Sequence, residues 1–424
     1  MNTVSGRRAL AVTAAAGALA LLASCSAAPA PANPPSPPSP LSATTAPFPS
    51  SVPARSLTAP GCSVAVAPVR TLAGVRPVMT QVPAAPFGVI TSPDGRWIFV
   101  SDSRGVTVLR AGAASPAVVR SVPLPGGQGL GEALTPDGRY LLVAAPSGTA
   151  VLDVARLESG SGQAVAGSLP APGGAIEVAT SADGRFVFTS REYADAVEVS
   201  DLARALSAGF GAGGLTAGQV PAGLEPVGEA VSPDGRWLYV TSEARASARM
   251  PRHPMSDSRC PGDPDALPGV VQAISVAAAE HHPSSAVRVT ADAGASPVRV
   301  VLSPGGKVAW VTARGSDALL GYATSRLTSG RPALIADVRV GSAPVGVILV
   351  DGGRLAVVAD SNRFAGRGAQ WLSVVSTQPA LAGRPALAGQ VRAGSFPRQF
   401  ALSPDGPPRP GHQARPDRAD RRDG

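Results

Sequence analysis

The sequence predicts an all-β fold, a seven-bladed β-propeller whose blades are four-stranded antiparallel sheets. Three observations support this prediction. A short phrase built on Ser-Pro-Asp-Gly recurs along the chain, most copies lie roughly 45 to 55 residues apart, and each copy stands between an apolar segment and an alternating one. Repeats of this length, with a turn between two β patterns, are typical of propeller blades.

The recurring phrase is a tight turn. Its first copy is Ser92-Pro93-Asp94-Gly95-Arg96, in which proline fixes φ and glycine accepts the positive φ that the turn needs. The segment after the turn is rich in aromatic and β-branched residues, which favour strands. Copies begin at residues 92, 135, 181, 232, 303, 350 and 403, so the repeat predicts seven blades.

Each repeat supplies four strands in chain order. The first strand lies before the turn and the second follows it, while a Gly, Ser or Asp turn leads to the third and an outer fourth completes the meander. The first strand is clearest at 87–90, 298–302 and 345–349, the third at 106–109, 150–154, 196–199 and 371–375, and the fourth at 118–122, 286–289 and 334–340.

The last repeat is broken. Its first strand is predicted at 398–402, but the turn is followed by Pro407-Pro408-Arg409-Pro410, and prolines at alternate places cannot pair in a central strand. We therefore expect the second strand of blade 7 to be absent, through a frameshift or a natural truncation. The segments 63–69 and 77–82 are expected to supply its third and fourth strands, so that both chain ends close the ring.

The N-terminus predicts export. Arg7-Arg8 precede an apolar run that is too short to span a bilayer, and this pattern is typical of a signal peptide over residues 1–24. The run ends in Leu22-Ala23-Ser24-Cys25, which resembles the lipobox of bacterial lipoproteins and implies diacylglycerol on Cys25. The export route, general secretory or twin-arginine, stays open. The protein is thus expected outside the cytoplasm, anchored to a membrane by lipid.

Composition divides the rest of the chain. Residues 25–60 are rich in Pro, Ala and Ser and are predicted to form a disordered tether, and 407–424 a disordered basic tail. The propeller is expected over 61–406, with an insertion at 245–267 between the second and third strands of blade 4. Its two cysteines, Cys62 and Cys260, form either a disulfide, which an oxidising compartment favours, or two unpaired thiols.

The distribution of charged residues and of histidines argues against nucleic-acid binding and against a metal site. The net charge is +8, but only Lys307 is a lysine and the arginines are spread along the chain, so we predict no nucleic-acid binding. No metal or cofactor site is predicted, because the histidines have no ligand spacing; they are His253, His281, His282 and His412.

The turn phrase and the strands around it resemble the YVTN-type β-propeller repeats, which belong to the broader group of WD40-like repeat proteins. Their consensus is a Ser-Pro-Asp-Gly-Arg turn, then a Leu-Tyr-Val-type strand and a Val-Ser-Val-Ile-Asp-type strand, and the resemblance covers residues 63–406. Relatives include lactonase-like propellers and the propellers of surface and periplasmic quinoproteins. The resemblance implies the fold, and it implies little about activity.

Polar residues on the otherwise apolar first strands are the candidates for a site, because these strands line the axial channel of a propeller. Glu132 and Glu229 share one register, whereas Glu177, Arg299 and Gln399 lie one residue earlier and fall on the opposite pleat unless a bulge intervenes. Arg398 stands beside Gln399. The channel candidates for catalysis are thus Glu132, Glu177, Glu229, Arg299 and Arg398.

These observations lead to three hypotheses about function. The favoured hypothesis is a monomeric, non-enzymatic binding or scaffold module at the cell surface that engages a protein, a glycan or a small ligand. The alternative is a lactonase-like hydrolase or isomerase that acts at the channel mouth through Glu132, Glu229 and Arg299. However, no histidine matches the one that the lactonase relatives use. A quinoprotein-associated propeller with a redox partner is the third hypothesis.

Overall fold

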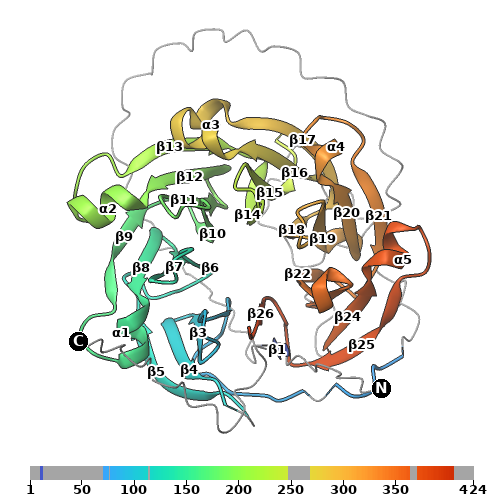
Figure 1. Cartoon of the computed structure of the whole chain (residues 1–424), viewed down its shortest axis with the longest axis horizontal. Helices are drawn as coiled ribbons and strands as arrows, with labels where there is room; N and C mark the ends of the chain where they lie inside the picture. The colour runs from blue at the N-terminus through green and yellow to red at the C-terminus, as the bar shows by residue number, and fades with distance from the viewer. Residues whose placement is uncertain are drawn as a thin grey trace, which may run out of the picture.

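The computed structural model describes residues 70–75, 77–112, 115–246, 268–362 and 370–404, and the backbone of Leu10–Val12. Six four-stranded antiparallel sheets stand as blades in a ring around a central axis (Figure 1). Each sheet takes its strands in chain order, and its first strand lies nearest the axis. The predicted all-β propeller of four-stranded antiparallel blades is confirmed.

The first three blades lie between residues 90 and 221. Blade 1 has β2 (Ile90–Thr91), β3 (Trp97–Asp102), β4 (Gly105–Arg110) and β5 (Ala117–Pro123). Blade 2 has β6 (Glu132–Leu134), β7 (Tyr140–Ala145), β8 (Gly148–Asp153) and β9 (Val165–Pro170). Blade 3 has β10 (Ala175–Thr180), β11 (Phe186–Arg191), β12 (Ala196–Asp201) and β13 (Thr216–Pro221).

The next three blades follow in the same order. Blade 4 has β14 (Leu224–Val231), β15 (Trp237–Ala244), β16 (Pro268–Ser275) and β17 (Val287–Ala295), and residues 245–267 connect β15 to β16. Blade 5 has β18 (Pro297–Leu302), β19 (Val308–Ala313), β20 (Ala318–Ala323) and β21 (Leu334–Arg339). Blade 6 has β22 (Pro344–Val350), β23 (Leu355–Asp360), β24 (Gln370–Ser376) and β25 (Leu387–Ala393).

Short helices, which the sequence did not predict, follow the third strand in blades 2 to 6. At three of them the last strand residue caps the helix, because the side chains of Asp153, Asp201 and Ser275 accept a hydrogen bond from a first-turn amide. No helix in the described part of the chain is long and apolar enough to span a membrane. The helices are α1 (Val154–Ser159), α2 (Leu202–Ala208), α3 (Val276–His281), α4 (Thr324–Leu327) and α5 (Thr377–Leu381), with 3-10 turns η1 (Pro283–Ser285), η2 (Arg314–Ser316) and η3 (Asp351–Gly353).

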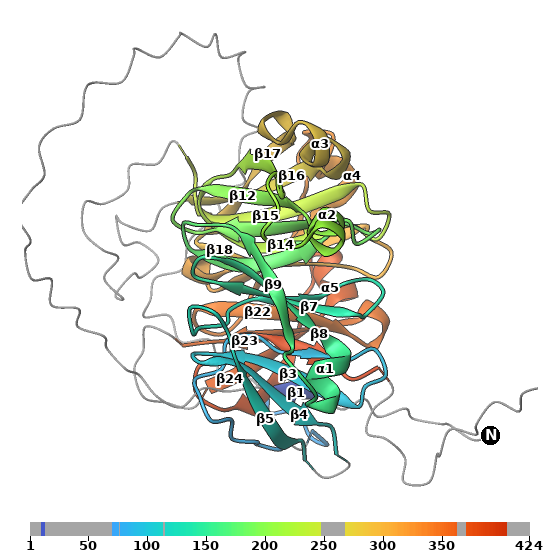
Figure 2. The same cartoon turned by 90° about the vertical axis from the view of Figure 1, so that its left-hand side faces the viewer.

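The strands run between the two faces of the ring (Figure 2). Since successive strands are antiparallel, the connection from the first to the second strand and that from the third to the fourth lie on the same face. This face, called the turn face below, therefore carries the repeated turns and the short helices, which gather on one side in Figure 2. The end of β15 and the start of β16 lie on the opposite face.

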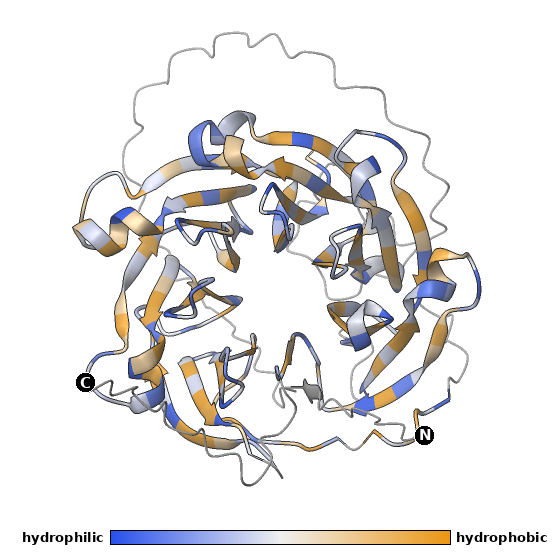
Figure 3. Cartoon of the chain, in the orientation of Figure 1, coloured by the Kyte–Doolittle hydropathy of each residue, from blue (hydrophilic) through white to orange (hydrophobic). Residues whose placement is uncertain are grey.

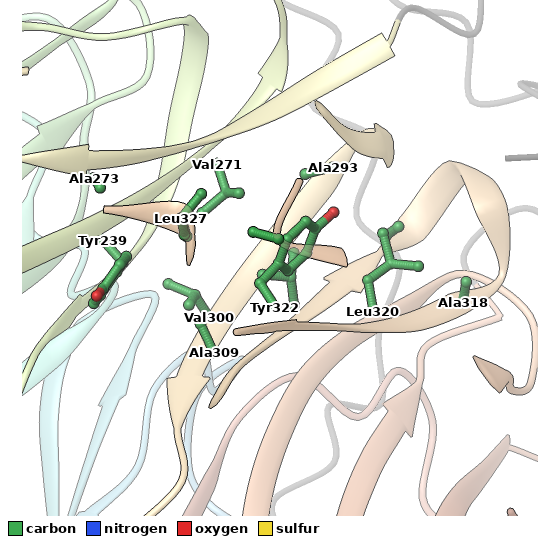
Figure 4. Packing of buried hydrophobic residues seen from close by; sticks show 13 residues of the cluster. Tyr239, Val271, Ala273, Ala293, Val300, Ala309, Ala318, Leu320, Tyr322 and Leu327 are labelled. Atoms are coloured by element: carbon green, nitrogen blue, oxygen red, sulfur yellow. The ribbon is translucent and has the colours of Figure 1, made fainter. Parts of the chain in front are cut away.

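Apolar side chains fill the spaces between neighbouring blades and form the core. Figure 3 shows apolar segments along the strands of the blades. Between blades 4 and 5 the cluster includes Tyr239, Tyr322 and Leu327, all almost completely buried (Figure 4). The Tyr322 hydroxyl donates to the carbonyl oxygen of Asp292 at 2.7 Å, so the buried ring leaves no polar group unpaired. Burial of these facing sheets is the main force that holds the blades together.

The repeated turn has the predicted geometry, with Gly95 at a φ of 68°. The Ser92 hydroxyl donates to Asp94 at 2.6 Å and accepts from the amide of Trp97 at 3.0 Å. The turn glycine also has a role that the sequence did not predict. A Cβ on Gly138 would lie only 2.8 Å from Pro93 of the preceding turn, and the turn glycine of each blade meets the preceding turn in the same way. Glycine is therefore also needed for the turns to pack around the ring.

The prediction of seven blades was wrong, because the described residues form six. The place in the ring where a seventh blade was expected, called the seventh place below, holds β26 (Phe400–Leu402). This strand pairs with β1 (Leu10–Val12) in a two-stranded sheet. The turn of the seventh repeat still takes its place in the ring, since Pro404 packs against Gly95, 3.0 Å from the position of a Cβ there. The prolines after residue 406 explain why the repeat stops, since they remove the amide donors that a second strand needs.

Of the two N-terminal segments predicted to complete blade 7, the structure contradicts one. Residues 77–82 form no strand, and Pro77 and Pro83 at its borders lack amide donors. Instead Thr71 forms a parallel bridge with Gln390 on the outer strand of blade 6. Gly389 permits this approach, because a Cβ there would lie 2.6 Å from the carbonyl oxygen of Arg70. Residues 63–69 lie outside the described residues.

Hydroxyl groups join the inner strands of neighbouring blades. Thr241 Oγ1 in β15 accepts from the amide of Gly228 at 3.1 Å and donates to the carbonyl oxygen of Val298 in the next blade at 2.9 Å. Thr312 bridges Arg299 and Val345 in the same way, at 3.0 and 2.7 Å. Each hydroxyl therefore satisfies one buried amide and one buried carbonyl near the axis.

Thr241→Val tests this bridge. The change keeps the side-chain shape but leaves the Gly228 amide and the Val298 carbonyl without their partner, so we expect the free energy of unfolding to fall by about 1–3 kcal/mol. Chemical denaturation measures it, with Ser325→Ala on the exposed part of α4 as the control. An unchanged unfolding midpoint would show that the two groups do not depend on the hydroxyl.

Candidate functional site

One equivalent position on the innermost strands lines the axis. It lies six residues before the third residue of each turn phrase. Blades 1, 2, 4 and 6 have glycine there, whereas blades 3 and 5 and the seventh repeat have polar side chains. In chain order the position is occupied by Gly88, Gly131, Glu177, Gly228, Arg299, Gly346 and Gln399.

The three polar side chains at this position meet one another, and we call them the axial cluster: Glu177, Arg299 and Gln399. Arg299 Nη2 lies 2.7 Å from Glu177 Oε2, and Gln399 Nε2 donates to the same oxygen at 3.0 Å. Arg299 Nη1 also donates to the carbonyl oxygen of Val227 at 3.2 Å. Only about a tenth of the Glu177 and Arg299 side chains is exposed, 10% and 11%. Hydrogen bonds and an ion pair thus connect blade 3, blade 5 and the seventh repeat at the axis.

The glycines at the equivalent position make room for the axial cluster. A Cβ on Gly131 would lie 2.5 Å from Glu177 Cδ, and one on Gly228 would lie 2.2 Å from the carbonyl oxygen of Val298. Larger residues at all seven places would not fit around one axis. The alternation of glycine with polar residues is therefore a condition for the cluster to form.

β-bulges direct the axial side chains inward. The pairing register of β10 with β11 shifts between Ala175 and Glu177, and that of β18 with β19 shifts between Pro297 and Val300. The sequence left open whether Glu177 and Arg299 face away from the channel or are turned by a bulge. The structure contains the bulge, which adds a residue to one strand and reorients the side chains there.

Burial and pairing act in opposite directions on Glu177. Loss of solvent raises the pKa of its carboxyl group, while the charge of Arg299 and the amide of Gln399 lower it. The net direction is upward. The Arg299 charge also lowers the pKa of Glu229, and the Arg398 charge also lowers that of Glu177, so the axial charges act on one another.

Glu132 and Glu229 each lie one residue after the axial position of their strand, and they face the preceding blade. Valines occupy this place in other blades, for example the almost fully buried Val178 and Val300. Neither carboxyl group has a hydrogen bond of ordinary geometry within the described residues. Burial raises the pKa of both carboxyl groups well above its usual value, and the Glu177 charge adds to this effect. The Ser101 amide and the Ser190 hydroxyl lower it only in part.

Arg398 lies on the opposite side of the axial cluster from the repeated turns. Its guanidinium carbon is 4.2 Å from the centre of the Phe87 ring and 4.9 Å from that of Phe396. The equivalent place in the six blades is apolar. Three of these residues, Val227, Val298 and Val345, form one buried cluster. These residues and the Arg398–aromatic contacts narrow the channel on this side.

A cavity of about 510 Å³ opens on the turn face. It is formed by the ends of β10, β14 and β18 and by the prolines of two repeated turns, Pro233 and Pro304. Its walls are mostly alanine, valine, leucine and proline, with Thr180, Ser303 and Glu229 as the polar members. The lining segments begin one residue after Glu177 and Arg299, so the axial cluster lies at its inner end.

The structure brings together only part of the predicted site. Glu177, Arg299 and Gln399 meet at the axis, and Arg398 stacks on aromatic rings. Glu132 is enclosed between blades, whereas Glu229 lines the cavity with its carboxyl oxygens buried. Cys25, Cys62 and Cys260 lie outside the described residues, so the lipid anchor and the disulfide stay predictions. Within the described ranges no group of three potential metal ligands occurs.

No protein-family model matches the chain, and no curated protein matches it. Solved structures do match. The periplasmic gluconolactonase of Pseudomonas aeruginosa has a TM-score of 0.58 at 21% identity, over 77% of this chain and 90% of that chain. Hydrazine synthase of Kuenenia stuttgartiensis has a TM-score of 0.57 at 18% identity, over 80% of this chain and 94% of that chain.

A third solved structure, of a protein of unknown function from Desulfotomaculum acetoxidans, has a TM-score of 0.55 at 12% identity and covers 76% of this chain and 90% of that chain. The chain is a β-propeller. A lactonase is among the structures that share this fold, as expected, but at these identities the likeness concerns the fold alone. Membership of the YVTN-type repeats stays a prediction.

Proposed function

We propose that this chain is an exported, membrane-anchored binding propeller, whose ligand is a small, largely apolar molecule held in the cavity on the turn face. One observation carries the proposal. The cavity, about 510 Å³, has the size of typical small-molecule sites, and its walls are apolar with few polar groups. A ligand with one or two hydrogen-bonding groups matches Thr180 and Ser303 at the rim.

The same geometry gives less support to a lactonase-like hydrolase. General acid or base catalysis requires a carboxyl group within hydrogen-bond reach of the substrate. The carboxyl oxygens of Glu132 and Glu229 are buried. Arg299, the third residue of the hydrolase hypothesis, is paired with Glu177. Catalysis through these residues would first have to expose the carboxyl oxygens of the two glutamates and break a buried ion pair.

The experiment is a fragment screen on the full chain by ligand-observed NMR, with two tryptophan variants. Thr180→Trp fills the cavity wall, whereas Ser325→Trp places the same side chain on the outer rim at α4. Compounds that bind the native chain are expected to lose at least about tenfold in affinity in Thr180→Trp, which corresponds to 1.4 kcal/mol. Binding in Ser325→Trp should be unchanged.

Two results would contradict the proposal. Fragments that bind both variants equally would place the ligand elsewhere. Hydrolysis of simple lactones by the native chain, if abolished by Glu229→Gln, would instead support the hydrolase.

A further inference from the structure

The inner strand of the seventh place is firmly held in the ring. The Thr91 hydroxyl of blade 1 donates to the carbonyl oxygen of Leu402 at 2.7 Å. Ala401 packs in the apolar cluster of blade 1, and Phe400 packs against that of blade 6. Gln399, just before the strand, bonds Glu177. β26 is therefore fixed without the remaining strands of a blade.

The chain cannot extend this sheet in the way it extends the others. In blades 1 to 6 the strand beside the innermost one is the segment that follows the repeated turn. In the seventh repeat the corresponding segment begins Pro407-Pro408-Arg409-Pro410. Without amide donors at these places it cannot form the ladder of a central strand.

Another part of the chain occupies the vacant place. β1 pairs antiparallel with β26 in the register Leu10↔Leu402, Ala11↔Ala401 and Val12↔Phe400. This segment belongs to no repeat, and the sequence predicts that it lies in a signal peptide that is removed. The edge of β26 thus accepts a strand that does not follow it in the chain, and removal of β1 would leave backbone groups at that edge unpaired.

The neighbouring blades specify the kind of strand that fits. The equivalent second strands are buried along their whole length in blades 1 and 3, as the patterns of β3 and β11 show. The seventh place is likewise bordered by apolar clusters of blades 1 and 6, which include Ile98, Val100, Leu372 and Val374. An occupant must therefore be extended, with apolar side chains on both faces where it lies against these clusters.

We infer that the edge of β26 is a strand-acceptor site for another polypeptide. An apolar segment of that partner, similar to the second strands of blades 1 to 6, pairs antiparallel with Phe400–Leu402 and replaces β1. This is β-augmentation, in which backbone hydrogen bonds supply affinity and flanking pockets supply specificity.

The test uses the full chain and a labelled peptide with the uncharged sequence of residues 237–242, which lies within β15, the second strand of blade 4. Ala11→Pro weakens the β1 pairing and should bind the peptide at least tenfold more tightly than the native chain, in which β1 competes. A control peptide carries Tyr239→Pro and should not bind. Fluorescence anisotropy measures both affinities.

Hydrogen exchange locates the contact and also shows whether the variant is folded. Peptide binding to Ala11→Pro is expected to slow exchange at the amides of Phe400–Leu402, with the rest of the ring unchanged. No binding to Ala11→Pro, or protection only elsewhere, overturns the inference. Dimerisation of Ala11→Pro with the same protection and no peptide would assign the site to a second copy of this chain and would likewise overturn the proposed partner.

Discussion

Glu177→Leu is expected to destabilise the propeller by about 3–5 kcal/mol, because it leaves the buried guanidinium of Arg299 without its counter-charge. The loss should be large since Glu177 Oε2 also accepts from Gln399, so the change removes one of the contacts that hold the seventh repeat in the ring as well. Chemical denaturation of the full chain at neutral pH measures the effect.

The double variant Glu177→Leu with Arg299→Leu separates the charge effect from packing. Replacing a buried pair by apolar residues is often neutral or stabilising, so the double variant should recover most of the loss. Arg354→Ala is the control, because it removes an exposed ion pair with Asp351 and should leave stability almost unchanged. If the double variant is no more stable than Glu177→Leu, the unpaired charge is not the cause.

Asp360→Asn is expected to stabilise the protein at alkaline pH and to flatten the pH dependence of its stability. Burial raises the pKa of Asp360 from 3.8 to about 8, and the charge of Asp317 adds to the rise, while the Ser373 hydroxyl and the Gly341 amide oppose it. The folded state therefore prefers the neutral acid. Its stabilising contribution is complete below pH 3.8 and is lost as the pH rises through 8.

The size of this effect follows from the shift. At about 1.4 kcal/mol per pKa unit, ionisation of Asp360 costs at most about 6 kcal/mol at high pH. Asparagine stays neutral and keeps an oxygen that accepts from Ser373, which lies 2.7 Å from the carboxylate. Urea denaturation at pH 5 and pH 9 should show a much larger gain for Asp360→Asn at the higher pH, because the stabilising contribution of the neutral acid begins to fall above pH 3.8.

Asp234→Asn is the matched contrast, because the sign is reversed there. The Ser232 hydroxyl and a backbone amide lower the pKa of Asp234, so its charged form is the one that stabilises the fold, and this contribution is lost as the pH falls through its folded pKa. The asparagine variant should lose stability at neutral pH. If Asp360→Asn and Asp234→Asn respond alike, the buried carboxyl group does not control the pH dependence.

The repeat allowed most of the fold to be predicted, because a blade is built from contacts that are close in the sequence. The strands predicted at 298–302 and 371–375, for example, lie within β18 and β24. The helices after the third strands were missed, although Asp153 and Asp201 are typical N-cap residues. The number of complete blades was overestimated, because N-terminal segments were expected to complete the seventh repeat, whereas among the described residues its place holds only β26 and its partner β1.

The site was predictable only as a list of residues. Glu177, Arg299 and Gln399 were recognised as polar residues on apolar strands. They are far apart in the sequence, however, and three whole blades lie between Glu177 and Gln399 along the chain. Their pairing depends on ring closure, on the bulges before Glu177 and Arg299, and on glycine at places such as Gly131. None of these conditions can be inferred from one strand in isolation.

The sequence by itself determined the blade, because alternating strands and a Ser-Pro-Asp-Gly turn specify local pairing. Only the tertiary structure decided which polar groups meet, which are enclosed and where a cavity opens, since these depend on how strands from different blades converge on one axis. Glu132 and Glu177 illustrate the difference. They are similar residues on equivalent strands, yet one residue of register places Glu132 between blades and Glu177 in an ion pair at the axis.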